Sequence, residues 1–302
     1  MDTKGLRLFV LAAEKSNISG AGKALGFGPA VSSAKLAKLE RELDSELLHR
    51  STRKVSLSVE GEEFLPFARE IIAQENAALD ALGHRQSEPK GMIRFASSST
   101  FAQLHVVPLL PKFMETFPLI GLDLRLSDSQ ADLIEGSFDL ALRNQNLADS
   151  TLKARKLADD ERVLCASPEY LARQGKPTSI ADLKAHQLIG FQGSAPRKLV
   201  SPEGEVQWFD PGKSERAFMV DDGLSQKLAT VAGAGLSVNS LWSVHEELKS
   251  GALIRLFNEY RIDDDVAIWL VYPRTNVLSA KVRALIDFLV TEIGEQPEWS
   301  LP

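Results

Sequence analysis

The chain has 302 residues, which exceeds the usual size of one domain, so we expect two or three compact units joined by linkers. Hydrophobic residues make up 44% and charged residues 25% of the chain, ordinary values for a globular protein that exclude extensive disorder. The net charge of −6 excludes a uniformly basic nucleic-acid binder, although one segment can still be basic.

Charge is in fact unevenly distributed along the chain. Residues 1–58 carry ten Lys and Arg against six Asp and Glu, a net charge of +4, so the remaining residues carry −10. A basic head on an acidic body suits a protein that presents one end to nucleic-acid phosphates. Because the chain has no apolar run of about 18 residues and no signal-peptide pattern, we expect a soluble, cytoplasmic protein that does not contact membranes.

The first 58 residues predict a helix-turn-helix. Apolar residues at helical spacing predict a first helix that ends near Lys15. Ser19 is expected to N-cap a short second helix over residues 20–25, which Gly26 ends. Pro29 suits the first position of a third helix, because its backbone nitrogen needs no hydrogen bond there. The buried stripe of this third helix is then formed by Leu36, Leu39 and Leu43.

In a helix-turn-helix the second helix of the pair lies in the major groove of DNA, with its N-terminal residues against base edges. A basic turn and an alternating strand, residues 50–58, follow this helix and predict a wing whose cations grip phosphates. The alternative is that these charges only solvate a loop. The predicted DNA contacts are Ser19, Pro29, Ala30, Ser32, Ser33, Ala34, Lys35, Lys38, Arg50, Ser51, Thr52, Arg53 and Lys54.

A long helix is predicted from Glu62 to about Leu82, with Pro66 in its first turn, where proline is tolerated. Its apolar stripe is too long for a small head to cover, so it must pack against something else. One possibility is an ordinary core helix that packs within its own chain. Residues 83–91 then form a hinge.

Short apolar strands alternate with helices from residue 92 onward, which is typical of an α/β fold with mainly parallel sheets. Helices are expected over residues 101–115 and 281–293. Strands are expected over residues 92–96, 122–126, 140–143, 162–166, 188–191, 217–220, 236–239 and 266–272. In such sheets ligands bind beyond the carboxyl ends of the strands, so the loops there are the candidate pocket.

Those loops are rich in hydroxyl and charged side chains. Residues 97–100 form a hydroxyl turn where a helix begins, and its side chains and free N–H groups can hold a carboxylate. The alternative is ordinary helix capping in a polar turn. Arg143 is expected to pair either with an acidic ligand or with Asp139. The predicted ligand contacts are Ser98, Ser99, Thr100, Ser127, Arg143, Asp221, Asp222 and Asn239.

No catalytic or cofactor site is expected. The run from His245 to Lys249 lacks the second histidine of a zinc-protease helix, and no nucleophile elbow or dinucleotide-binding fingerprint occurs. Cys165, the only cysteine, lies in an apolar strand, where a small buried side chain is expected. A single cysteine also excludes an internal disulfide and a multi-cysteine metal site.

The sequence resembles the LysR-type transcriptional regulators nearly end to end. In the head the resemblance is carried by GFGPAVSSAKLAKLE (residues 26–40) and LLHRSTRKVSLS (residues 47–58). In the C-terminal region it is carried by FDLALR (138–143), LADSTLKARKL (147–157), ASPEYL (166–171), VYP (271–273) and KVRALIDFL (281–289). The chain departs from the family at Ala34, where an Arg or Lys is usual, at Asp221 in place of Asn, and at Ser240 in place of Pro.

The resemblance implies an α/β protein with a winged helix-turn-helix at residues 1–61, a linker helix and hinge at 62–88, and an effector-binding domain at 89–302. That domain would have two Rossmann-like lobes, as in periplasmic binding proteins. Lobe I would comprise residues 92–161 and 267–302, and lobe II residues 162–266. The linker helices of two chains would pair through Leu65, Ala68, Ile72 and Leu79.

By the same resemblance, dimers and tetramers would bind and bend promoter DNA, with access of RNA polymerase altered by a small-molecule effector between the lobes. No cofactor is implied. Two alternatives remain open: a small-molecule-binding protein, and an α/β enzyme with an accessory DNA-binding head. The first would need an export signal, and the second a catalytic constellation, and neither is present in the sequence.

Overall fold

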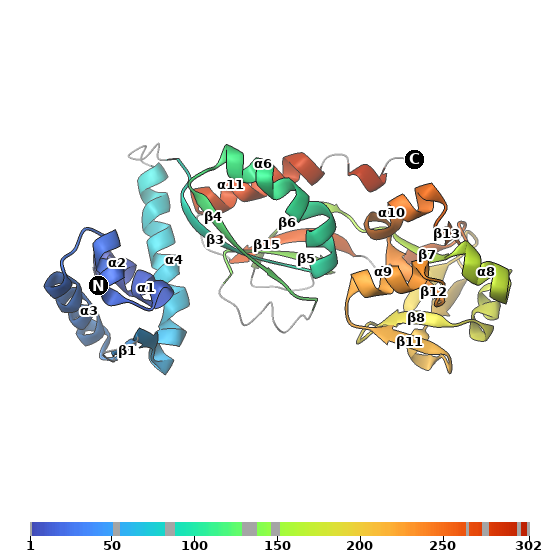
Figure 1. The fold of residues 1–302 in the computed structure, drawn as a ribbon, viewed down its shortest axis with the longest axis horizontal. Helices are drawn as coiled ribbons and strands as arrows, with labels where there is room; N and C mark the ends of the chain where they lie inside the picture. The colour runs from blue at the N-terminus through green and yellow to red at the C-terminus, as the bar shows by residue number, and fades with distance from the viewer. Residues whose placement is uncertain are drawn as a thin grey trace. The chain divides into compact units, whose positions relative to one another are not determined.

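The computed structural model describes residues 2–50, 55–81, 88–128, 138–145, 152–263, 266–273, 278–294 and 297–300. Its contacts divide the chain into a head unit, which comprises residues 1–88 and 275–280, and a C-terminal unit, which comprises residues 89–274 and 281–302 (Figure 1). The expected fold class is confirmed: helix-turn-helix, long helix and two α/β lobes follow one another in this order.

Three helices form the head: α1 (Thr3–Lys15), α2 (Ile18–Ala24) and α3 (Pro29–Leu43). The predicted start of α2 was wrong. Asn17, not Ser19, caps this helix, because its Oδ1 accepts a hydrogen bond of 2.9 Å from the backbone nitrogen of Gly20. The core between the helices is closed by fully or nearly fully buried side chains, among them Leu6, Leu8, Phe9, Ala12, Ala21, Leu36, Leu39, Leu47 and Leu48.

A short hairpin follows α3. Strand β1 (Leu48–Arg50) pairs antiparallel with β2 (Val55–Leu57), as expected for a wing. Helix α4 (Val59–Ala81) starts earlier than predicted, so Pro66 lies inside the helix, beyond its first turn. Gly61 lets α4 approach β1 closely, since a Cβ on it would stand 2.0 Å from the carbonyl oxygen of Leu47.

The first half of α4 packs against the head of its own chain. Ala68 is fully buried in the head core, and Leu65 and Ile72 are partly buried against it. Ala68 therefore cannot contact a second chain, which corrects its assignment to a dimer interface. The alternative of a helix packed within its own chain holds for this half of α4. Beside this apolar contact, Arg7 of α1 forms a 2.8 Å ion pair with Glu75 of α4.

The first sheet of the C-terminal unit has the strand order β4-β3-β5-β15-β6. Strands β3, β4 and β5 are parallel, whereas β15 runs antiparallel to β5 and β6, so the sheet is mixed rather than mainly parallel. The strands are β3 (Gly91–Ser97), β4 (Ile120–Leu126), β5 (Leu140–Gln145), β6 (Leu152–Asp159) and β15 (Ala267–Pro273). The helical segments of this lobe are α5 (Ser99–Phe101), η1 (Ala102–Val106), η2 (Val107–Leu109), α6 (Leu110–Thr116), α11 (Ala280–Leu289) and η5 (Val290–Gly294).

The second sheet has the order β11-β8-β12-β7-β13, with the first three strands parallel and the last two antiparallel to their neighbours. Its strands are β7 (Arg162–Ala166), β8 (Leu188–Phe191), β11 (Ala217–Val220), β12 (Leu236–Ser240) and β13 (Ile254–Arg255). Beside it, β10 (Val206–Phe209), β9 (Arg197–Val200) and β14 (Arg261–Asp263) form a small antiparallel sheet that was not predicted. The helical segments are α8 (Pro168–Gln174), η3 (Ile180–Ala185), η4 (Pro211–Lys213), α9 (Gly223–Val231) and α10 (Leu241–Ser250).

The chain passes from the first sheet to the second between Asp159 and Arg162 and returns between Asp263 and Ala267. We call the parts of the molecule around the two sheets lobe I and lobe II. A cluster of rings, which we call the aromatic seam, joins them: Phe101 and His105 of lobe I, Trp242 and His245 of α10, and Trp299 of the C-terminal turn η6 (Glu298–Ser300).

Candidate nucleic-acid interface and ligand cavity

The N-terminal part of α3 presents an exposed face. Pro29, Ala30, Ser33 and Ala34 are all exposed, as a helix that enters a DNA groove requires. Val31, which the sequence prediction omitted, is also exposed, at 48% of its surface. Its position between two predicted contact residues could have identified it.

Ser32 does not lie on this face. Its side chain is fully buried where α2 and α3 meet, and its hydroxyl donates to the carbonyl of Gly28 at 3.0 Å. A Cβ on Gly22 would stand 2.0 Å from Ser32 Oγ, which shows how closely the two helices approach. Ser32 therefore packs at the contact between the two helices, and its assignment as a DNA contact was wrong. Ser19, the other hydroxyl predicted here, is exposed on α2.

The two lysines of α3 already have partners within the head. Lys35 Nζ bonds to Asp2 Oδ2 at 2.9 Å and lies 5.4 Å from the centre of the Phe27 ring. The Lys35 hydrogen bond is the main reason that the pKa of Asp2 is lowered from 3.8. Lys38 lies 3.8 Å from Glu42, one turn along the helix. Ala34 supplies no cation at a position where the family usually has one. To supply it instead, Lys35 or Lys38 would have to leave its carboxylate partner.

Most of the expected wing contacts lie, in sequence, between strands β1 and β2. Ser51, Thr52, Arg53 and Lys54 lie outside the described residues, as does the side chain of Arg50. The start of β1 is held against α3, because Glu40 of α3 accepts hydrogen bonds from the backbone nitrogens of Leu47 and Leu48, at 3.1 and 3.3 Å.

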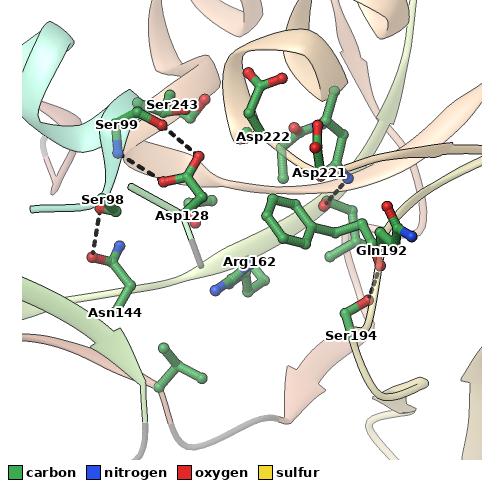
Figure 2. Close-up of a pocket in the computed structure, with 18 of the residues that line it drawn as sticks. Ser98, Ser99, Asp128, Asn144, Arg162, Gln192, Ser194, Asp221, Asp222 and Ser243 are labelled. Atoms are coloured by element: carbon green, nitrogen blue, oxygen red, sulfur yellow. Dashed lines mark hydrogen bonds between the residues drawn. The ribbon is translucent and has the colours of Figure 1, made fainter. Parts of the chain in front are cut away.

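A cavity of about 1070 Å³ lies between the two lobes of the C-terminal unit (Figure 2). It is lined by the ends of strands and the loops that follow them, from both lobes. The structure brings all the predicted ligand contacts to its wall: Ser98, Ser99, Thr100, Ser127, Arg143, Asp221, Asp222 and Asn239.

On the lobe I side, Asp128 occupies the hydroxyl turn. Its two oxygens accept from the backbone nitrogen of Ser99 at 2.7 Å and from Ser99 Oγ at 2.5 Å, and Figure 2 shows the carboxylate against this turn. Two of the donors at which a ligand carboxylate was expected, the backbone nitrogen and the hydroxyl of Ser99, therefore already hold a carboxylate of the chain. Ser98 Oγ is the donor to Asn144 Oδ1, at a long 3.5 Å.

On the lobe II side, two predicted ligand contacts form hydrogen bonds within the protein. Asp222 caps α9, with Oδ1 accepting from Ser225 N at 2.8 Å. The Asn239 amide donates to Ser237 Oγ at 2.6 Å and to Cys165 Sγ at 3.4 Å, so its nitrogen is committed to the core of lobe II.

Asp139 was one of the two partners expected for Arg143. The carboxylate of Asp139 bonds to Lys281 Nζ and to the backbone nitrogen of Arg94, at 3.1 and 3.0 Å. Burial lowers the pKa of the Arg143 guanidinium, as expected where a cation is partly removed from water at a cavity wall.

The prediction omitted a second group of lining residues. The loop after β8, residues 192–195, lies on the wall together with Arg162, Arg197, Trp242 and Ser243. Because β8 is a parallel strand, the rule that ligands bind at carboxyl ends could have identified its loop. Trp242 and Ser243 begin a helix that was not predicted, so no signal placed them there.

Within the described ranges, no group of His, Cys, Asp and Glu could hold a metal ion, and no helix is long and apolar enough to cross a membrane.

Two protein-family models match the chain, one over the head and one over the region that contains the cavity. The "Bacterial regulatory helix-turn-helix protein, lysR family" model matches residues 3–62, and the "LysR substrate binding domain" model matches residues 86–294. The chain belongs to the LysR-type transcriptional regulators. It is thus a DNA-binding transcriptional regulator with an effector-binding domain, not an enzyme, and the sequence prediction of function is confirmed.

Full-length relatives support the assignment of this LysR-type regulator. DmlR of Escherichia coli (strain K12), an HTH-type transcriptional regulator, is 32% identical over 303 residues that cover 98% of this chain and 96% of DmlR. CrgA of Neisseria meningitidis serogroup C is 32% identical over 293 residues, 97% of each chain. The solved structure of CrgA from Neisseria meningitidis covers 97% of this chain and 99% of its own, with a TM-score of 0.61 at 30% identity.

Proposed function

We propose that this regulator binds promoter DNA through the exposed face of α3 and responds to a small molecule held in the cavity between its lobes. The observation that carries the proposal is the exposed N-terminal face of α3 directly after the short helix α2, in a chain whose head is basic and whose remainder is acidic. The acidic remainder would be repelled by phosphates, so DNA would meet the head alone.

Sequence would be recognised largely by apolar contact. Ala30, Val31 and Ala34 offer methyl groups, which fit the C5-methyl group of thymine, and Ser33 offers one hydroxyl to a base edge. Since α3 has no cation at Ala34, affinity would depend on the wing residues Arg50 to Lys54, which would hold the phosphates beside the groove.

We propose a homodimer that places two α3 helices in successive major grooves, about 34 Å apart, and tetramers that bend the promoter. The side of α4 that is left for a second chain includes Phe67, exposed over 61% of its surface, and the half-buried Leu79. Leu65 and Ile72 contribute only through the part of each side chain that the head leaves uncovered.

The cavity would couple ligand binding to DNA bending. The chain crosses twice between the lobes, and a ligand that contacts both lobes stabilises one angle between them over others. Such a change would alter the bend and the access of RNA polymerase to the promoter. The protein would act in the cytoplasm, where this DNA lies.

A gel-shift titration of the full chain with the DNA flanking its own gene tests the proposal. We expect binding at low salt that weakens as salt rises, because phosphate contacts release counterions. Arg53→Ala should weaken binding to every sequence and reduce the slope of log affinity against log salt by about 1. The matched control is Lys176→Ala, which removes an exposed cation of lobe II and should change neither quantity.

Absence of any shift at low salt would count against DNA binding by this chain. An Arg53→Ala protein that binds like the parent would count against the wing alone.

A further inference from the structure

The positive and negative charges on the cavity wall balance. Arg143, Arg162 and Arg197 face the same cavity as Asp128, Asp221 and Asp222. Arg162 is moreover bonded at 3.1 Å to Asp160, a buried carboxylate behind the wall. A ligand with a net negative charge would thus enter a site that is already neutral or slightly acidic, whereas a ligand with balanced charges would not change its total.

Three buried donors on this wall have no acceptor among the residues that the structure describes. They are the Oγ1 of Thr100, which is 3% exposed, and the Nε1 of Trp242 and Oγ of Ser243, whose residues are each 6% exposed. An indole N–H can only donate, and both hydroxyls have a proton to give. Buried donors without partners are rare, so the wall is suited to a ligand group with several acceptor oxygens, such as a carboxylate.

Carboxylates of the protein stand next to these donors. Asp221 makes no hydrogen bond or ion pair within the part of the chain that the structure describes, and Asp222 uses one oxygen to cap α9. The residue that follows them, Gly223, is so close to Thr100 that a Cβ on it would lie 2.9 Å from Thr100 Oγ1. An acceptor for a cationic group and a donor for an anionic group are therefore neighbours.

We propose that the cavity binds an α-amino acid, with its carboxylate toward Thr100 and Ser243 and its ammonium toward Asp221 and Asp222. An α-amino acid carries its two charged groups on one carbon, which matches the adjacency of donors and carboxylates, and it has no net charge from these groups. Asp128 already fills the Ser99 donors, so the ligand carboxylate uses the other donors. Phe191 and Phe209 on the wall offer apolar contact to a side chain. This inference rests on the proposed ligand-binding role of the cavity.

Thermal-shift measurements on the full chain test the inference, with the twenty common amino acids each compared with the carboxylic acid that lacks only the α-amino group. Succinate and putrescine serve as dianionic and dicationic probes. We expect at least one amino acid to raise the melting temperature, and its deaminated counterpart to bind at least about tenfold more weakly, since it leaves Asp221 and Asp222 without a cation.

Asp221→Asn keeps the shape of the side chain and removes its charge, and it should weaken binding of that amino acid about tenfold. Glu259→Gln, which neutralises an exposed carboxylate of lobe II outside the cavity wall, should leave binding unchanged.

Binding of succinate but not of any amino acid, or no shift with any amino acid at millimolar concentration, overturns the inference. A gel shift with the same protein sample separates failure of this inference from failure of the proposed function. DNA binding without amino-acid binding refutes this ligand class and does not contradict the proposed function. Equal binding of an amino acid and its deaminated counterpart also refutes the role of the Asp221–Asp222 pair.

Discussion

At Gly22, the absence of a side chain decides how closely α2 and α3 approach. A methyl group there would overlap the hydroxyl of Ser32, 2.0 Å away, and would also stand 3.3 Å from the carbonyl oxygen of Phe27. We expect Gly22→Ala to destabilise the head by about 1–3 kcal/mol, because a packed helix pair must move apart. Hydrogen exchange of the α1–α3 amides measures the change.

The matched control for this prediction lies in the same helix. A Cβ on Gly20 would meet only Asn17, at 3.5 Å or more, which is ordinary contact. Gly20→Ala should therefore leave the head as stable as the parent or stabilise it by up to about 1 kcal/mol, through the better helix propensity of alanine. If both variants have the same effect, the close approach at Gly22 is not what sets the geometry of the pair.

Cys165 should be unreactive in the folded protein. Burial raises the pKa of its thiol to about 11, and the hydrogen bond from Asn239 offsets only part of this effect. At pH 8 the thiolate is therefore scarce, and the side chain is also fully enclosed. We expect iodoacetamide to leave the native chain unmodified and to label it once after denaturation, as measured by intact mass. Labelling of the native protein would show that lobe II opens.

At the scale of elements, α4 is divided between two roles along its length. Its first half completes the head core, while Phe67 and Leu79 remain available to another surface. We expect Phe67→Glu and Leu79→Glu to lower the dimer fraction in sedimentation experiments, because a carboxylate in an apolar helix pair must be desolvated.

The two glutamate variants should leave the head folded, because neither side chain belongs to its buried core. Ala68→Glu is the contrasting change: it should unfold the head, since it places a charge inside the core. Dimers of unchanged stability in both Phe67→Glu and Leu79→Glu would show that α4 is not the interface.

The elements that the sequence predicted are those with strong periodicity or strong boundaries. Helix α3 runs from Pro29 to Leu43 as expected, because proline marks its start and the leucine stripe its buried face. The small sheet of β9, β10 and β14 was missed, since its strands are only three or four residues long and carry charged and polar side chains. Short strands of this kind are specified by their partners rather than by a local pattern.

For the candidate sites, the sequence predicted many of the residues that lie there but not the partners of their side chains. The carboxyl-end rule found eight residues of the cavity wall, because strand ends of one sheet edge converge whatever their loops contain. What each side chain does there depends on partners distant in sequence, as for Asp128 with Ser99. On α3, Ser32 is buried although it was predicted to contact DNA, whereas Val31, which the prediction omitted, is exposed. The crossing with α2, and not polarity alone, decides which face of the helix is buried.

At the scale of the whole C-terminal unit, the aromatic seam joins lobe I to lobe II through a histidine. His105 Nε2 lies 2.9 Å from the carbonyl oxygen of Trp242, and its ring is 4.5 Å from that of Trp299. His245, whose ring is 6.2 Å away, lies 3.2 Å from the same carbonyl through Nδ1. The charged groups that act on His105 are Lys227, Glu298 and a protonated His245.

The seam makes the stability of the C-terminal unit depend on pH. Burial lowers the pKa of His105 below its usual 6.5; the Trp242 carbonyl and Glu298 oppose this effect, and His245 and Lys227 add to it. The unfolded chain therefore takes up the proton more readily than the folded one, so the free energy of unfolding is greatest above pH 6.5 and falls as the pH drops below it. The measurement is melting followed by tryptophan fluorescence between about pH 8 and pH 5, which reports this unit alone because all four tryptophans lie in it.

His105→Gln should flatten this pH dependence without removing it, because burial also lowers the pKa of His186, whose Nδ1 lies 3.1 Å from the hydroxyl of Tyr170. His49→Gln, which replaces an exposed imidazole of the head, is the control and should leave the profile unchanged. If the His105→Gln profile is as steep as that of the parent, the acid sensitivity arises elsewhere and the histidine of the seam serves only to pack the lobes together.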